Sequence, residues 1–187
     1  MSSLVGRLLN AVSNERSTTL LLPYQEDLLD EVKEIMEKQN TIIESYNERI
    51  QDLDKTQQIF CQAMELEVLR WRYLIQVYLT ARLKKIQAMV GNMVIPIKEK
   101  LSEAEASYCA EFAIIFKNAL GETELDFSQE DEDLSSFVFF KPLVDAGSTL
   151  ISSNATNEIV DLKKDQIYFA RLEHVKSLLD DEKVVLL

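Results

Sequence analysis

The chain has 187 residues, 47% of them hydrophobic, and its 20 basic and 32 acidic side chains give a net charge of −12. This hydrophobic content excludes a wholly disordered chain. The acidic balance argues against a general binder of nucleic acid or anionic membrane. Only four glycines and three prolines occur. The composition therefore favours helices over folds that need many tight turns.

Hydrophobic residues recur at helical spacing through the first half of the chain. The spacing predicts a short helix over 3–14 and, behind Pro23, a helix of about eight turns over 24–53. This second helix has one apolar stripe and an acidic opposite face, which is typical of a helix that covers a core. A third helix is predicted over 56–90.

A last helix of this region is predicted over 102–120. Ser102 and Glu105 have the spacing of a capping box, in which each residue bonds to the backbone N–H of the other. Gly121 suits the C-terminal cap because glycine adopts the left-handed conformation without strain.

The predicted third helix differs from the others because it lacks a polar side. Between Val68 and Leu83 the polar residues scatter around the whole helical wheel at about 100° per residue. A helix that is apolar on nearly all sides is buried by its neighbours. A bundle of this size can hardly surround such a helix, so we expect part of it to face another chain. Its arginines must then be paired, because an unpaired buried charge is very costly.

The stretch 70–100 is basic within an acidic chain. It holds seven basic residues against Glu99, a net charge of +6. One interpretation is a nucleic-acid patch, and the other is ion pairing within or between subunits. The aromatic residues alternate with aliphatic core positions and form no stacking platform, which favours ion pairing.

The composition changes after residue 120. Acidic residues crowd 121–134, which we interpret as a mobile linker. Short runs of aromatic, β-branched and leucine residues then predict strands, with a loop at 152–154 and one helical turn near Val175. The predicted strands are 137–140, 159–162, 167–172 and 184–187.

These elements predict an α+β protein. A mainly α-helical bundle domain over 1–120 is followed by the linker and by a small C-terminal β-rich domain over 135–187. A β-rich domain of this length has too few apolar positions for a large core. We therefore expect it to dock on another surface.

No recognised catalytic, cofactor-binding or metal-binding pattern is present. The single histidine, His174, is paired with no nucleophile motif, and Cys61 and Cys109 lie 48 positions apart, which disfavours a zinc site. We interpret both cysteines as reduced packing residues of an intracellular protein. Asp131 and Asp133 are interpreted as solvated charge. No run is long and apolar enough for a transmembrane helix. The prediction is a non-enzymatic protein without cofactor, metal or membrane association.

Several segments resemble subunits of the GINS complex, most closely its Sld-five family. Residues 67–73 and 78–86 resemble the central helix of that family. Further segments resemble it in the same order: 8–15 with 21–22, 101–112, 136–139 and 159–162. The residues that we expect at a partner interface are Arg70, Trp71, Arg72, Tyr73, Tyr78, Arg82, Lys85 and Ile86.

The resemblance implies a function in DNA replication. The chain would be a non-catalytic, nuclear subunit of a heterotetramer with three other GINS subunits. That tetramer would join the MCM ring and the Cdc-forty-five protein in the replicative helicase and help connect the leading-strand polymerase. Direct DNA contact would be weak or absent.

Two alternatives stay open from the residues alone. One is a self-contained helical adaptor, such as a homodimeric coiled coil built on 24–53. The other is a nucleic-acid-binding module that uses the basic stretch 70–100.

Overall fold

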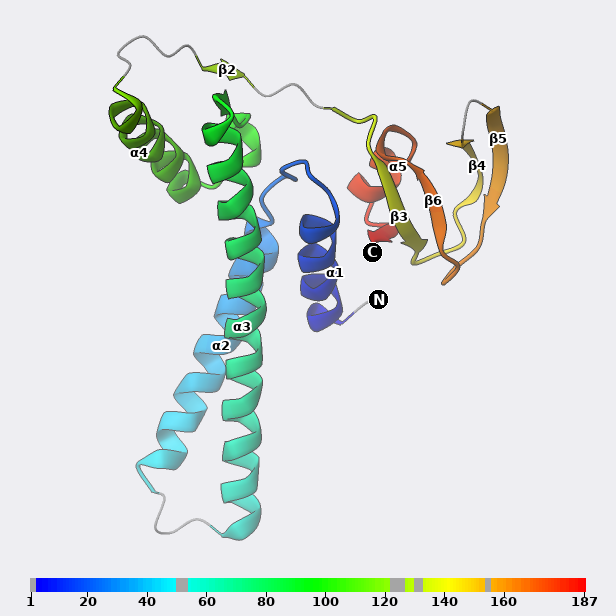
Figure 1. Ribbon diagram of the computed structural model, residues 1–187. Coiled ribbons are helices and arrows are strands. Elements are labelled where there is room, and N and C mark those ends of the chain that lie inside the picture. The colour runs from blue at the N-terminus through cyan, green and yellow to red at the C-terminus, as the bar shows by residue number, and fades with distance from the viewer. Residues whose placement is uncertain (1–2, 50–53, 122–126, 130–132, 154–155) are drawn as a thin grey trace. The chain divides into compact units, whose positions relative to one another are not determined.

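The computed structural model describes residues 3–49, 54–121, 127–129, 133–153 and 156–187. Helices come first and are followed by a group of short strands with one further helix (Figure 1). This order confirms the predicted α+β class, a helical region followed by a small β-rich C-terminal region. The chain forms two compact units, which combine Met1–Val12 with Tyr24–Thr80 and Ser13–Pro23 with Ala81–Leu187. The predicted domain boundaries at 120 and 135 stay predictions.

The three predicted helices of the first half are present with shifted ends. They are α1 (Leu4–Ser17), α2 (Glu26–Asn47) and α3 (Lys55–Gly91). The start of α3 follows from a reciprocal cap, because Gln57 N–H donates to Asp54 Oδ1 at 2.7 Å and Asp54 N–H donates to Gln57 Oε1 at 3.0 Å. The predicted continuation of the second helix over 50–53 lies outside the described residues. Among the described residues, no helix is long and apolar enough to cross a membrane.

The core of the first unit lies between α2, α3 and the first turns of α1. In Figure 1, α2 and the first part of α3 run side by side. Tyr78 also positions the start of α2, because its hydroxyl accepts a hydrogen bond from Gln25 N–H at 3.2 Å. Eight buried residues form the main cluster: Leu8, Val12, Leu28, Leu29, Val32, Trp71, Leu74 and Tyr78.

In the second unit, the end of α3 packs against α4 (Glu103–Leu120) and the segment that follows α1. Leu21, Ile86, Val90 and Cys109 form the buried cluster there. The predicted capping box is confirmed, since Ser102 Oγ accepts from Glu105 N–H at 3.2 Å and Ser102 N–H donates to Glu105 Oε2 at 3.1 Å. The helix then ends at Gly121 with φ of 69°, as predicted for its C-terminal cap.

Short elements flank α4. Strand β1 (Val94–Ile95) and a 3-10 turn, η1 (Lys98–Lys100), precede it. Within the predicted acidic linker, β2 (Ser128–Gln129) pairs with β1 in parallel. The neighbouring Phe127 packs partly buried against the cluster of Ile86 and Cys109, so an apolar anchor accompanies this pairing.

The β-rich region combines a three-stranded antiparallel sheet of order β6-β3-β7 with a hairpin of β4 and β5. A helix, α5, joins β6 to β7, and Val175 on α5 is buried with Phe140 in the core of this region. The elements are β3 (Phe137–Pro142), β4 (Gly147–Ser153), β5 (Thr156–Leu162), β6 (Tyr168–Arg171), α5 (Leu172–Asp180) and β7 (Val184–Leu186).

Two local predictions were wrong. Ser152 and Ser153 belong to β4 and pair with Asn157 and Thr156 of β5, where a loop was predicted. Polar residues near the turn of a hairpin are easily predicted as a loop, because backbone pairing rather than a hydrophobic pattern places them in the strand. The predicted single helical turn near Val175 is a nine-residue helix.

Replacing Ser102 with alanine should lower the free energy of unfolding by about 1 kcal/mol, because the cap of α4 is lost. Hydrogen exchange at the amides of α4, read by mass spectrometry, measures this change. Ser107 lies exposed within α4 and provides the matched control. Ser107→Ala should be neutral or slightly stabilising, and an equal loss in both variants would contradict the capping role.

Candidate functional site

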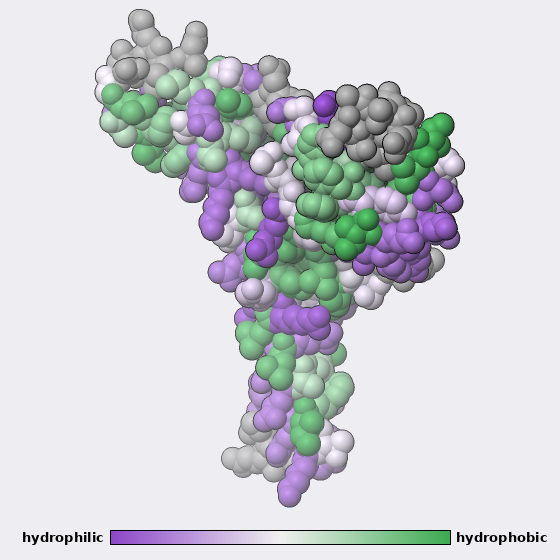
Figure 2. Space-filling view, turned by 45° about the vertical axis from the view of Figure 1, so that its right-hand side comes forward, coloured by the Kyte–Doolittle hydropathy of each residue, from purple (hydrophilic) through white to green (hydrophobic). Residues whose placement is uncertain are grey.

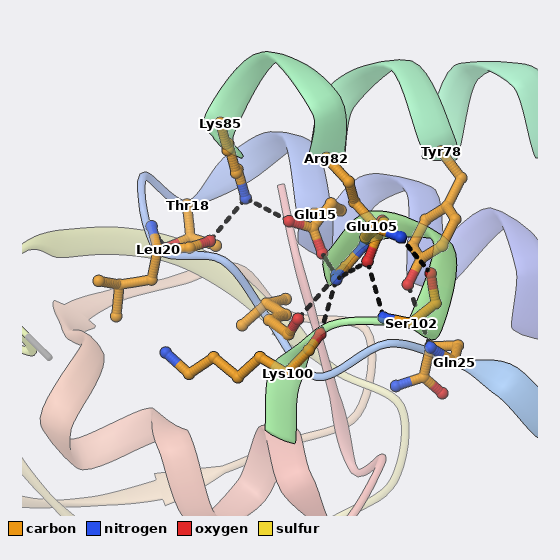
Figure 3. A network of polar contacts seen from close by, with 11 residues as sticks. Glu15, Thr18, Leu20, Gln25, Tyr78, Arg82, Lys85, Lys100, Ser102 and Glu105 are labelled. Atoms are coloured by element: carbon orange, nitrogen blue, oxygen red, sulfur yellow. Dashed lines mark hydrogen bonds and ion pairs between the residues drawn. The ribbon is translucent and has the colours of Figure 1, made fainter. Parts of the chain in front are cut away.

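A buried arginine organises the helical part of the second unit (Figure 3). Arg82 lies on α3 and is completely buried. Its guanidinium grips the Glu105 carboxylate with two parallel bonds, Nε to Oε1 at 2.8 Å and Nη2 to Oε2 at 2.9 Å. The remaining bonds run to Glu15 Oε2 at 3.1 Å and to the carbonyl oxygens of Leu22 at 2.6 Å and Lys100 at 2.7 Å. The five N–H donors of the side chain thus match five acceptors.

A second cation completes the charge balance of this network. Lys85, one helical turn after Arg82, donates to Glu15 Oε1 at 2.7 Å and to the carbonyl oxygen of Leu20 at 2.6 Å. Two cations therefore face two carboxylates, those of Glu15 and Glu105. Because both carboxylates are also buried, each charge is stabilised by its partners rather than by water.

The three buried members of the network lie on apolar stripes of their helices. Glu15 follows Leu8 and Val12 on α1, and Arg82 falls between Tyr78 and Ile86 on α3. Glu105 precedes the buried Cys109 by one turn of α4. Sequence reasoning predicted that the arginines are paired but did not find these acidic partners. The sequence signal that could have identified them is a single charged residue within an otherwise apolar stripe of a helix.

The predicted interface residues divide into two groups. Trp71, Tyr78, Arg82 and Ile86 are buried inside the chain, and Lys85 is largely buried by the network. These five side chains serve the chain's own core.

The other three predicted interface residues, Arg70, Arg72 and Tyr73, are exposed on α3. The structure therefore does not bring the eight residues together as one surface. An interface role stays a prediction, and the exposed group is the part that is accessible to a partner.

The side of α3 opposite its buried stripe carries a row of exposed apolar residues, with exposed Gln62 among them. At about 100° per residue, its members fall roughly half a turn away from Val68, Trp71 and Tyr78. Each member is more than half exposed. Figure 2 shows hydrophobic side chains at the surface over the part of the molecule that α2 and α3 occupy in Figure 1. We call this surface the outer face of α3, and it consists of Ile59, Leu66, Leu69 and Tyr73, with exposed fractions of 66%, 67%, 56% and 64%.

The basic stretch 70–100 does not present one continuous cationic surface. Arg82 and Lys85 form ion pairs with carboxylates, and Lys100 is only 8% exposed. The pairing interpretation is thus confirmed for Arg82 and Lys85. Their partners lie in the same chain.

The described residues contain no group of three or more histidine, cysteine or carboxylate side chains placed to hold a metal ion. Cys61 and Cys109 are buried free thiols. Burial raises the pKa of the Cys109 thiol, because desolvation disfavours the thiolate. The Ser135 hydroxyl and N–H donate to Asp133 and lower its pKa, which keeps this carboxylate ionised.

Arg82→Ala should lower the free energy of unfolding by about 3–5 kcal/mol, because it leaves two carboxylates buried without their shared cation. Arg82→Lys should recover little of this loss, since an ammonium group cannot reproduce the two-pronged contact with Glu105. Hydrogen exchange at the amides of α3 and α4, read by mass spectrometry, measures both variants. Arg72→Ala, which removes an exposed guanidinium from the same helix, should stay within about 0.5 kcal/mol. A similarly small effect of Arg82→Ala would show that the network is dispensable.

In a Cys61→Ser variant, the remaining thiol of Cys109 should react slowly with iodoacetamide at pH 8. Its raised pKa leaves less thiolate at this pH than a free cysteine has, and burial limits access. Mass spectrometry measures the rate, and the same chain in concentrated urea is the control. Equal rates in folded and unfolded chain would contradict the burial of Cys109.

Comparison with known proteins places the chain in a family. No protein-family model matches it. A curated relative, the DNA replication complex GINS protein SLD5 of Dictyostelium discoideum, is 32% identical over 203 aligned residues. The alignment covers 99% of this chain and 92% of that protein. Identity at this level along nearly the whole chain confirms the resemblance seen in the sequence: the chain belongs to the SLD5 family of GINS DNA replication proteins.

Proposed function

We propose that the chain is a non-catalytic structural subunit of a heterotetrameric GINS complex. Its partners are three other GINS subunits, and it works by burying helix faces between subunits. The complex joins the MCM ring and the Cdc-forty-five protein in the nuclear replicative helicase and helps connect the leading-strand polymerase. Membership in the SLD5 family and the exposed apolar surfaces of the helices support this proposal.

The observation that carries the proposal is the outer face of α3. Water covers it in the single chain, although Leu66, Leu69 and Tyr73 lie close together on it. Fully burying side chains of this kind is worth about 1.5–3 kcal/mol each. A partner that covers them therefore gains a large part of the free energy that a stable subunit contact needs.

Charges beside this face specify the kind of partner that fits it. Exposed Arg70 and Arg72 lie on its two flanks, at about 100° and −60° from Leu69 around the helix. Exposed Glu65 lies beside Arg72, at about −40° from Leu69, so a partner helix with an apolar stripe and flanking charges of both signs complements this surface. Complementary charge of this kind favours the correct partner over others.

A second apolar surface lies in the second unit. Ile114 and Ile115 are exposed on the side of α4 that faces away from the buried Cys109. A subunit of a heterotetramer with more than one neighbour needs more than one contact surface, and α3 and α4 each provide one.

The engagement of Arg82 and Lys85 with carboxylates supports a role without strong direct DNA binding. Phosphate contacts require accessible cations. Replacing Lys84 and Lys98 with glutamine should therefore leave the affinity for DNA unchanged. A salt-sensitive DNA affinity that these changes abolish would favour the nucleic-acid-binding alternative.

Affinity purification of the chain from its native cell tests the assembly directly. Three other GINS subunits in equal amounts are expected, and light scattering should give the mass of one copy of each. The chain expressed alone should aggregate, because its apolar faces stay uncovered. A defined homodimer would instead support the adaptor alternative. A clean, cooperatively folding monomer would remove the physical basis of the proposal.

The double variant Leu66→Glu/Leu69→Glu should abolish co-purification with the partner subunits. Two carboxylates on the outer face of α3 cannot be desolvated there without a large cost. Quantitative pull-down after co-expression measures the loss. The matched control is Ile167→Glu, at a similarly exposed position between β5 and β6, and it should assemble normally. Normal assembly of the double variant would refute the role of this face.

A further inference from the structure

The free edge of strand β7 is covered by side chains of α1. On its inner side β7 pairs with β3, with Leu186 opposite Phe140 and Leu187 N–H donating to Phe139 O at 3.0 Å. Backbone groups of successive strand residues point to alternate edges. The N–H and C=O of Leu186 therefore point away from β3, toward the open edge of the sheet.

Two residues of α1 satisfy both of these groups. Ser13 Oγ donates to Leu186 O at 2.6 Å, and Leu186 N–H donates to Asn14 Oδ1 at 2.7 Å. The pair reproduces the two bonds that a residue of a neighbouring strand would make. An edge strand with open backbone groups is a template for pairing with other chains, and this contact closes it.

The same segment also binds the helical part of the second unit. We call residues 13–23 the N-terminal strap. Within it, Glu15 joins the Arg82 network and Leu21 is buried with Ile86. Leu20 packs against the core of the β-rich region, while its carbonyl accepts from Lys85. The strap therefore contacts both halves of its unit through polar and apolar groups.

We propose that the N-terminal strap is a latch that holds the β-rich region to the helical part of the second unit. The strap then positions the region through contacts of its own, which do not depend on the covalent connection between α4 and β3. The latch consists of the Ser13 and Asn14 bonds and the Leu20 contact, while Glu15 and Leu21 anchor the strap. Opening it exposes the edge of β7 without breaking β7 from β3.

A cleavage experiment tests whether the strap, rather than the covalent connection, holds the β-rich region in place. A recognition sequence for a specific protease is inserted at 130–132 in the full chain, co-expressed with any subunits that it needs. After cleavage, the two fragments of the otherwise unchanged chain should still co-elute in size-exclusion chromatography. In the variant Ser13→Ala/Asn14→Ala/Leu20→Ser the C-terminal fragment should separate. Separation of the unchanged fragments, or retention in the variant, would overturn the proposal.

Hydrogen exchange distinguishes an opened latch from general unfolding. In uncleaved Ser13→Ala/Asn14→Ala, the amide of Leu186 should exchange about tenfold faster, as expected for the loss of two hydrogen bonds. Amides that join β3 to β6 should be unchanged. Alanine is a better helix former than serine or asparagine, so α1 itself is not weakened. Unchanged exchange at Leu186, or equal acceleration in β3 and β6, would refute a local latch.

Two further variants serve as controls. Asn14→Asp keeps an oxygen acceptor for Leu186 N–H, so it should retain most of the protection. Asn10→Ala removes an asparagine one turn earlier on α1, whereas the bonds to Leu186 come from Ser13 and Asn14, so this change should have no effect at β7. Loss of protection in Asn10→Ala equal to that in Ser13→Ala/Asn14→Ala would show that α1 acts only by its general stability.

Discussion

The ion network around Arg82 is the constraint on which the second unit depends. One guanidinium gathers acceptors from the end of α1, the segment after it, the turn before α4 and α4 itself. A buried pair is weak evidence for stability by itself, but removing one partner of it is strongly destabilising. The network therefore favours the arrangement in which these segments lie together, because separating them while the charges stay buried leaves a charge without compensation.

The long helix α3 has two apolar sides with different roles. One side forms the chain's own core through Trp71 and Tyr78, and the opposite side lies in water. This arrangement explains why its sequence shows no polar face: both sides are apolar, and only one of them is covered by the single chain. Such a helix suits a subunit of a complex. Its inner side packs in the chain's own core, and its outer side remains accessible for contact with another subunit.

Glu15 and Glu105 each combine local and long-range roles. Glu105 completes the capping box with Ser102 and also grips Arg82, so the start of α4 and its packing on α3 are linked. Glu15 accepts from both Arg82 and Lys85 within the strap that also holds β7 through Ser13 and Asn14. Neighbouring residues at the end of α1 thus bind both the edge of the sheet and the ion network.

The sequence alone determined the first four helices and the capping box of Ser102, because periodic burial and caps depend on neighbours in the chain. It also determined the fold class and the family, and it indicated that α3 lacks a broad polar side. Only the tertiary structure decided the acidic partners of Arg82 and the residues that cover β7. Glu15 and Arg82 are 67 positions apart in the chain, and hydropathy does not specify which buried charges meet. Ser152 and Ser153 show the same limit, since strand pairing with β5 overrides their preference for loops.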